Sequence, residues 1–163
     1  MVLEIVLTLL AVVIIGVIVN LCENKIKENG RKMSFKEAMD LAELPIVTFY
    51  QGEKKFNFLL DTGSNLSHIS KEACKDISGE IIGTHAKVSG LGEATSSAIC
   101  KASLNYKGTD YDIDLCVTDN LTNAFATIKS ETGVQVHGLI GNKFFQKHKY
   151  ILDFGELVAY TKK

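Results

Sequence analysis

The hydrophobic and polar positions divide the chain into an uncharged apolar start and a longer part built from short segments. Residues 5–19 carry no charge, and with Val2, Leu3 and Leu21 the run approaches the ~20 residues that cross a bilayer as a helix. The run has no polar face at helical spacing, which disfavours a buried helix of a globular domain. We therefore expect a transmembrane anchor over residues 1–22, in contact with membrane lipid.

Two processing signals compete with this interpretation. A cleaved signal peptide has positive charge before its apolar run and small residues at the cleavage site, whereas here Glu4 precedes the run and Val19-Asn20-Leu21 follow it. We therefore expect no cleavage. A lipoprotein signal at Leu21-Cys22 is an alternative, although a bulky leucine stands where a small residue normally precedes the cysteine.

The charges around the apolar run predict its orientation. Basic residues cluster just after it, and only the terminal amine lies before it. Because basic residues near a span tend to stay on the cytoplasmic side, we expect a single-pass membrane protein whose folded part faces the cytoplasm. The basic residues are Lys25, Lys27, Arg31 and Lys32.

The polar stretch after the anchor gives way to a series of short apolar runs. Residues 23–43 are expected to form a juxtamembrane linker and a short helix, which Ser34 and Glu37 open as a capping box and which ends before Pro45. Residues 44–163 then alternate short apolar runs with turn signals, which is typical of strands. The predicted strands are residues 46–50, 56–60, 85–88, 97–106, 111–117, 134–140, 150–154 and 157–160, and a short helix is predicted over residues 142–147.

Strands at this spacing predict a mainly β fold, a small closed barrel or a sandwich. With 163 residues the chain has room for one such domain and an appendage. The net charge of −1 gives no electrostatic reason to expect nucleic acid as a partner. The four cysteines and four histidines show no spacing typical of a metal site, so we expect no metal, and thiols that are buried or free.

One acidic residue stands out because an apolar strand leads directly into it. Phe58-Leu59-Leu60 precedes Asp61, and Thr62, Gly63 and Ser64 follow. A buried carboxylate is costly unless it is hydrogen-bonded, and the two hydroxyls and the Gly63 amide are local donors that can hold it. An aspartate in a turn also often caps its own backbone, so these residues alone leave a catalytic and a structural role open.

The segment Leu59-Leu60-Asp61-Thr62-Gly63-Ser64 resembles the active-site signature of the aspartic peptidases. About eighty residues later, Leu139-Ile140-Gly141 resembles the apolar segment that in this family threads beside the catalytic loop and leads into a short helix. Between them, Gly90-Leu91-Gly92 stands where retropepsin-like proteins carry the flap, a hairpin tip that closes over substrate. The resemblance covers roughly residues 44–161 and implies a retropepsin-like barrel over residues 44–163.

The resemblance also implies an activity and an assembly. The chain carries a single Asp-Thr-Gly, as in the single-lobed retroviral proteases, so the working enzyme is expected to be a homodimer that cleaves peptide bonds with two Asp61 carboxylates. Thr62 is expected to bond across the dimer, Gly63 to allow a tight turn and Leu139, Ile140 and Gly141 to support the loop. No metal or organic cofactor is expected.

Two other functions fit the sequence less well. A membrane-tethered peptide-binding or assembly domain could keep this fold without turnover, but the intact Asp61-Thr62-Gly63-Ser64 argues against it. A cysteine hydrolase would need a thiol activated by a base, and no sequence context singles out Cys74, Cys100 or Cys116.

Overall fold

The computed structural model describes residues 10–22, 31–88 and 95–161. Residues 10–22 form a helix whose side chains are exposed, and residues 1–9 of the expected anchor lie outside the described part. Among the described residues, no helix combines the length and the apolar character needed to span a bilayer.

The rest of the described chain is mainly β structure, with four short helices. The strands are β1 (Lys32–Ser34), β2 (Ile46–Gln51), β3 (Lys54–Leu60), β4 (Ser67–Ser70), β5 (Gly79–Val88), β6 (Thr95–Tyr106), β7 (Thr109–Thr118), β8 (Gly138–Ile140), β9 (Tyr150–Asp153) and β10 (Val158–Thr161). The helices are α2 (Lys36–Ala42), α3 (Lys71–Cys74), α4 (Thr122–Thr132) and α5 (Asn142–His148).

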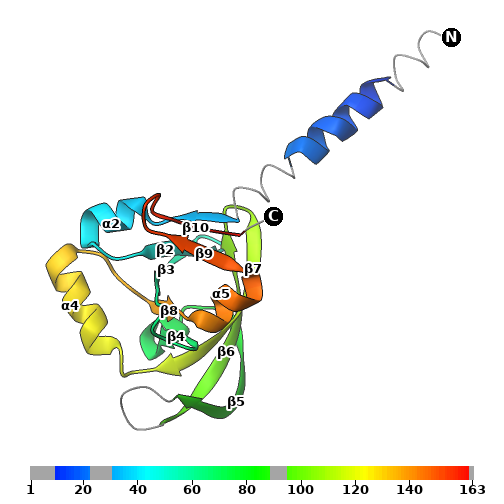
Figure 1. Ribbon diagram of the computed structural model, residues 1–163. Coiled ribbons are helices and arrows are strands. Elements are labelled where there is room, and N and C mark those ends of the chain that lie inside the picture. Colours follow the sequence, from blue (N-terminus) through cyan, green and yellow to red (C-terminus); the bar gives the residue numbers. More distant parts are fainter. Residues whose placement is uncertain (1–9, 23–30, 89–94, 162–163) are drawn as a thin grey trace.

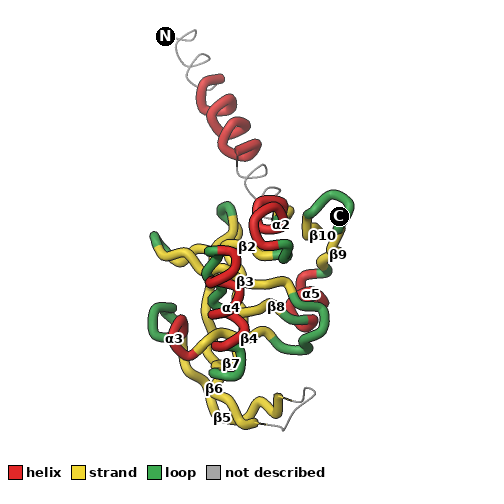
Figure 2. Tube along the Cα trace, turned by 90° about the vertical axis from the view of Figure 1, so that its left-hand side faces the viewer, coloured by secondary structure: helices red, strands yellow, loops and turns green. Residues whose placement is uncertain are grey.

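Six strands close into a barrel. They pair in the order β2-β3-β8-β4-β7-β6, and the pairing of Tyr50 on β2 with Asn105 on β6 joins the two ends. β5 adds to β6 outside the ring as a long hairpin that extends away from the barrel (Figures 1 and 2). The predicted mainly β barrel with a short helix near the C-terminus is thereby confirmed.

The barrel is filled from alternate positions of its strands, as a strand with one buried face requires. Phe49 of β2 is fully buried at the centre of the aromatic core. The rings of Phe58, Tyr106, Tyr111 and Phe144 meet it edge to face at 5.9–6.4 Å between centroids. Such contacts add to the stabilisation that burial of the rings provides.

A second, three-stranded sheet has the order β1-β10-β9. Met33 of β1 and Ala159 of β10 are paired and buried, and the amide of Ser34 donates to the Tyr106 hydroxyl of the barrel at 3.0 Å. The sequence analysis placed residues 32–34 in the linker and the start of the helix. The structure instead ties this segment to the end of the chain.

Besides β1, three further elements were not predicted from the sequence. The strand β4 and the helix α3 are short, and α4 occupies a stretch for which no helix was predicted. α4 lies along one side of the barrel (Figures 1 and 2), where Phe125 packs in a second apolar cluster with Ile46 and Val136. The predicted strand over residues 134–140 is shorter, because only Gly138–Ile140 joins the sheet as β8.

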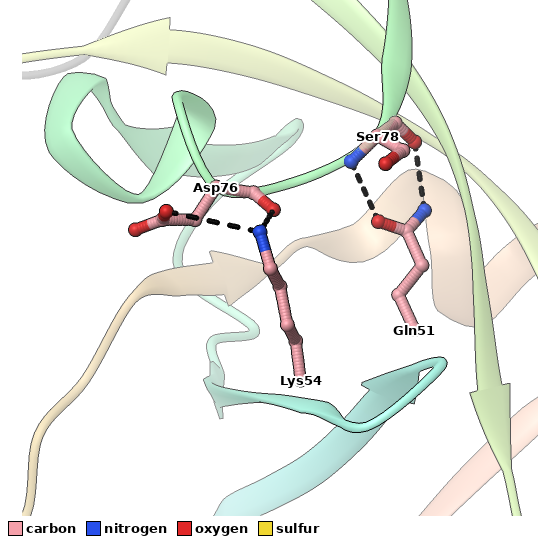
Figure 3. A network of polar contacts seen from close by, with 4 residues as sticks. All are labelled: Gln51, Lys54, Asp76 and Ser78. Atoms are coloured by element: carbon pink, nitrogen blue, oxygen red, sulfur yellow. Dashed lines mark hydrogen bonds and ion pairs between the residues drawn. The ribbon is translucent and has the colours of Figure 1, made fainter.

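The tip of the β2–β3 hairpin is fastened to the segment between α3 and β5 (Figure 3). The Gln51 side chain accepts from the Ser78 amide at 2.6 Å and donates to the Ser78 carbonyl at 2.7 Å. Lys54 donates to the carbonyl of Asp76 at 2.7 Å. These contacts hold the base of the β5–β6 hairpin against the barrel.

Candidate active site

β3 delivers Asp61 to the surface at the point where the two sequence motifs meet. β3 and β8 run parallel, with Leu60 paired to Ile140. The amide of Asp61 then donates to the Ile140 carbonyl at 2.9 Å, which continues the ladder by one residue. Segments about eighty residues apart in sequence therefore lie side by side, and the aspartate is half-buried at the end of the barrel.

The Asp61 carboxylate is held by its own loop. The amide of Gly63 donates to Asp61 Oδ1 at 2.8 Å. A Cβ atom on Gly63 would lie 3.1 Å from the same oxygen, which is tighter than an ordinary contact, so glycine fits this turn best. Thr62 and Gly63 are exposed, which leaves the loop accessible from outside.

The start of α5 supports the loop by hydrogen bonds to the backbone carbonyls of the loop. The Asn142 amide donates to the Ser64 carbonyl at 2.8 Å, and its side chain donates to the Thr62 carbonyl at 2.7 Å. Gly141 packs so closely on the loop that a Cβ there would collide with the Leu66 carbonyl and lie 2.9 Å from the Ser64 oxygen. The glycine therefore makes the close approach possible.

The two hydroxyls of the loop do not hold the carboxylate as the sequence analysis expected. Ser64 Oγ donates to the Leu66 carbonyl at 2.8 Å and so closes the loop on itself. The Thr62 backbone carbonyl accepts a hydrogen bond from the Asn142 side chain. Within the described part of the chain, the Thr62 hydroxyl has no hydrogen-bond partner. The donor to Asp61 is thus the Gly63 amide.

The remaining predicted site residues fall into two groups. Leu139 and Ile140 are buried on opposite faces of β8, with Ile140 in the barrel core beneath the loop. The expected flap residues Gly90, Leu91 and Gly92 lie outside the described residues. The strands that lead to and from them, β5 and β6, form the hairpin drawn in Figure 1.

Sequence reasoning missed His68 of β4, which is 7% exposed. Burial lowers the pKa of His68 below its ordinary value, and the Asp61 carboxylate opposes this by raising it. Because burial is the larger effect, the ring is neutral near pH 7. No local pattern marks this histidine, since its neighbours come from other strands.

The cysteines of the barrel are poor nucleophiles. Burial, followed by the nearby Cys74 thiol, raises the pKa of Cys100 to about 11, and burial also raises the pKa of Cys116. Both thiols therefore stay protonated near neutral pH, whereas a cysteine nucleophile acts as thiolate. Among the described residues, no cluster of three or more histidine, cysteine or acidic side chains is arranged to hold a metal ion.

No protein-family model and no curated protein matches the sequence. Among solved structures, the fold is similar to that of EIAV protease complexed with the inhibitor HBY-793, with a TM-score of 0.51 and 17% identity over 71% of this chain and 97% of that chain. The retroviral protease-like domain of Ddi1 from Leishmania major gives a TM-score of 0.47 and 13% identity over 74% of this chain and 89% of that chain. The likeness to EIAV protease shows that the chain has a retropepsin-like fold.

Proposed function

We propose that the chain is an aspartic endopeptidase in which Asp61 activates a water molecule. The observation that carries the proposal is the joined site, in which an accessible carboxylate at the end of β3 is held by the Gly63 amide and its loop is fixed by Gly141 and Asn142. This arrangement occurs in a retropepsin-like fold, which supports peptide cleavage as the reaction.

The chemistry needs two carboxylates close together. Such a pair shares one proton, because two neighbouring negative charges repel each other. One carboxylate then takes a proton from water while the other donates one to the peptide carbonyl. The chain carries one Asp-Thr-Gly, so we propose that a second copy supplies the other Asp61.

The exposed face of the loop supports a homodimer. Thr62 and Gly63 are exposed next to the carboxylate, and the Thr62 hydroxyl is available to a partner copy. A two-fold axis at this loop would place each Thr62 against the equivalent loop of the other chain, since a two-fold interface joins the same surface of both subunits. The bound ligand would be a peptide or protein segment, with no metal or organic cofactor.

Comparing peptide-library digestion by the wild-type chain and by Asp61→Asn tests the activity. The substituted asparagine keeps the shape of the side chain but cannot act as a base, so cleavage should be lost while the domain stays folded. Asp153→Asn is a matched control, because Asp153 caps its own turn through the Gly155 and Glu156 amides, away from the loop. Cleavage that survives in Asp61→Asn would refute the assignment, and binding without cleavage by the wild type would favour the peptide-binding alternative.

We also propose that the apolar segment at residues 1–22 anchors the chain in a membrane with the barrel on the cytoplasmic side. The support is the uncharged run and the basic residues after it. In a chain with Cys22 and Cys74 replaced by serine, Lys163→Cys should be protected from an impermeant maleimide in intact cells and labelled after lysis. Labelling in intact cells would contradict the proposed orientation. Recovery of the chain in the soluble fraction would contradict the proposed membrane anchor.

A further inference from the structure

A cavity of about 350 Å³ is walled by β7 and α5 beside the loop that follows Asp61. Its apolar lining comes from four segments, with Leu66 of the loop, Ile99 of β6, Ile113 and Cys116 of β7 and Phe144 of α5. Because a cavity of about 150 Å³ is enough for a benzene-sized group, this cavity has room for a bulky apolar side chain.

Hydrogen bonds fix the walls of this cavity to the catalytic loop. Lys143 and Ser67 both line the cavity. The Lys143 amide donates to the Asn65 carbonyl of the loop at 3.1 Å, and Ser67 Oγ accepts from the Gly141 amide at 3.1 Å. The cavity therefore keeps a set position relative to the loop that carries Asp61.

The cavity is also within reach of a peptide bound at Asp61. Leu66 follows Asp61 by five residues, and an extended chain covers at most about 3.6 Å per residue, so the two lie within about 18 Å of each other. An extended peptide of five to six residues spans about the same distance. A substrate cleaved at Asp61 can thus place a side chain several residues away in the cavity.

The mouth of the cavity carries balanced charge. Four of its lining side chains belong to exposed residues, Asp112 and Asp114 of β7 and Lys143 and Lys147 of α5, so the cavity opens to solvent between them. Lys147 Nζ also donates to the Asp112 carbonyl at 2.9 Å, which ties α5 to β7. Two positive and two negative charges cancel, and the mouth therefore favours no ion of either sign.

The interior selects by hydrophobicity. Ile113, Cys116 and Phe144 are 3%, 3% and 4% exposed, so the groups that a ligand would meet are those of the barrel wall. A charged group that entered would lose its hydration against apolar neighbours, which is costly. An apolar group would leave water for a matching environment, which is favourable.

We propose that this cavity binds a bulky apolar side chain of the peptide substrate, such as leucine, methionine or phenylalanine, several residues from the cleaved bond. The inference rests on the proposed peptidase function. Since the walls are fixed to the catalytic loop, the apolar residue should occur at one constant distance in sequence from the cleaved bond.

Affinity selection separates this inference from the activity itself. The full chain carrying Asp61→Asn, which should bind without cleaving, selects from a randomised peptide library, and the selection is repeated with Ile99→Phe added to fill the cavity. We expect leucine, methionine and phenylalanine to be enriched about 10-fold over alanine at one position, and this enrichment to be lost in the filled chain. Digestion of the library by the wild type then gives the place of that position relative to the cleaved bond.

A matched control makes the same exchange outside the cavity. Ile81 of β5 is 57% exposed and does not line the cavity, so Ile81→Phe should leave the peptide profile unchanged. If Ile99→Phe folds poorly, Ile99→Ala enlarges the cavity instead and should shift the preference toward phenylalanine and tryptophan.

The outcomes distinguish the inference from the proposed function. If the wild type cleaves peptides through Asp61, the inference alone is overturned by a profile that both Ile99 variants leave unchanged, or by the absence of apolar enrichment. An apolar preference that Ile99→Phe removes, without cleavage by the wild type, overturns the proposed function and keeps the cavity as a peptide-binding site. Absence of both binding and cleavage overturns both.

Discussion

The side-chain amide of Asn142 donates a 2.7 Å hydrogen bond to the backbone carbonyl of Thr62. The first residue of α5 is thereby fixed to the residue that follows Asp61. The backbone amide of Asn142 donates to the Ser64 carbonyl at 2.8 Å, so this one asparagine bonds to two carbonyls of the loop. If Asp61 is catalytic as proposed, its placement decides the rate, and Asn142 would be a positioning residue that touches no reacting atom.

Replacing Asn142 by alanine removes the side-chain bond but leaves the backbone bond to Ser64. We expect a loss of about 1 kcal/mol in the free energy of unfolding, as for one hydrogen bond. The turnover number should fall more than the Michaelis constant rises, since the loop geometry suffers rather than substrate contact. Steady-state kinetics and urea unfolding measure both, with exposed Asn123→Ala in α4 as control; equal kinetics for the two variants would contradict the positioning role.

Gly141→Ala should be among the most damaging single changes in the domain. The added Cβ collides with the Leu66 carbonyl and crowds the Ser64 oxygen, and backbone atoms cannot move aside as a side-chain end can. We expect a destabilisation of about 2–3 kcal/mol with loss of activity. Thermal unfolding checks this against Gly16→Ala, where nothing lies within 4 Å; similar melting temperatures for both variants would show that the loop can relax.

The sequence was most informative where one local pattern determines one element. The strands that became β6 and β7 were predicted because each is a long run of strand residues. They are joined at Lys107-Gly108, and both residues have the positive φ that a tight hairpin connection needs. By contrast, β4 has the sequence Ser-His-Ile-Ser and becomes a strand only because β7 and β8 pair with it on either side. α4 likewise lacks a side-chain cap at its start, and a single residue, Phe125, is buried.

The site shows the same division between local and non-local causes. Asp61 and Gly63 were identified because their motif is contiguous and the bond between them is local. Ser64 was considered as a donor to the carboxylate, but its hydroxyl donates to the Leu66 carbonyl, an acceptor two residues away that the motif does not reveal. Asn142 acts through partners on another segment, and no pattern in one stretch of sequence indicates those partners.

Gln51 should contribute more to stability than its neighbour Lys54 on the same hairpin. Gln51 makes two short bonds to Ser78 and a third to the Ser103 carbonyl at 3.1 Å, whereas the Lys54–Asp76 ion pair is 3.8 Å long between largely exposed side chains. We expect Gln51→Ala to cost about 1–2 kcal/mol and Lys54→Ala less than about 1 kcal/mol. Gln51→Glu keeps the acceptor but loses the donor, so chemical unfolding should place it between wild type and Gln51→Ala.

The barrel should lose stability as the pH falls through the range in which histidine titrates. Burial, with a smaller contribution from Lys147, lowers the pKa of His148 below its ordinary value of 6.5, and burial likewise lowers the pKa values of His68 and His137. The unfolded chain therefore binds more protons than the folded chain below about pH 6.5. Stability is full above that pH and declines as the pH falls toward the lowered pKa values.

His148→Phe isolates one part of this dependence. The His148 ring packs 4.6 Å from Phe144 and 5.1 Å from Tyr111 between centroids, and its buried Nε2 has no partner among the described residues, so phenylalanine should fit without a lost hydrogen bond. We expect equal or greater stability at about pH 7.5 and a smaller loss at about pH 5. Denaturant unfolding at both values measures this, and an unchanged pH dependence would mean that His148 titrates alike in both states.

The shared site makes activity depend on which chains meet. If each working site needs two Asp61 carboxylates, wild-type chains mixed with an excess of Asp61→Asn and allowed to exchange will mostly enter heterodimers with one competent carboxylate. With about a tenfold excess of the variant, random pairing should lower activity per wild-type chain about tenfold. The matched control is the same excess of a chain carrying both Asp61→Asn and Gly141→Ala, whose distorted loop should pair poorly and suppress less.

Specific activity should also fall on dilution of a chain beginning near Arg31, and fall less for the full chain in membranes, because confinement to a surface raises the effective concentration. Activity that tracks the wild-type amount alone, at dilutions where sedimentation finds only monomer, would refute the shared site and require a second carboxylate within one chain.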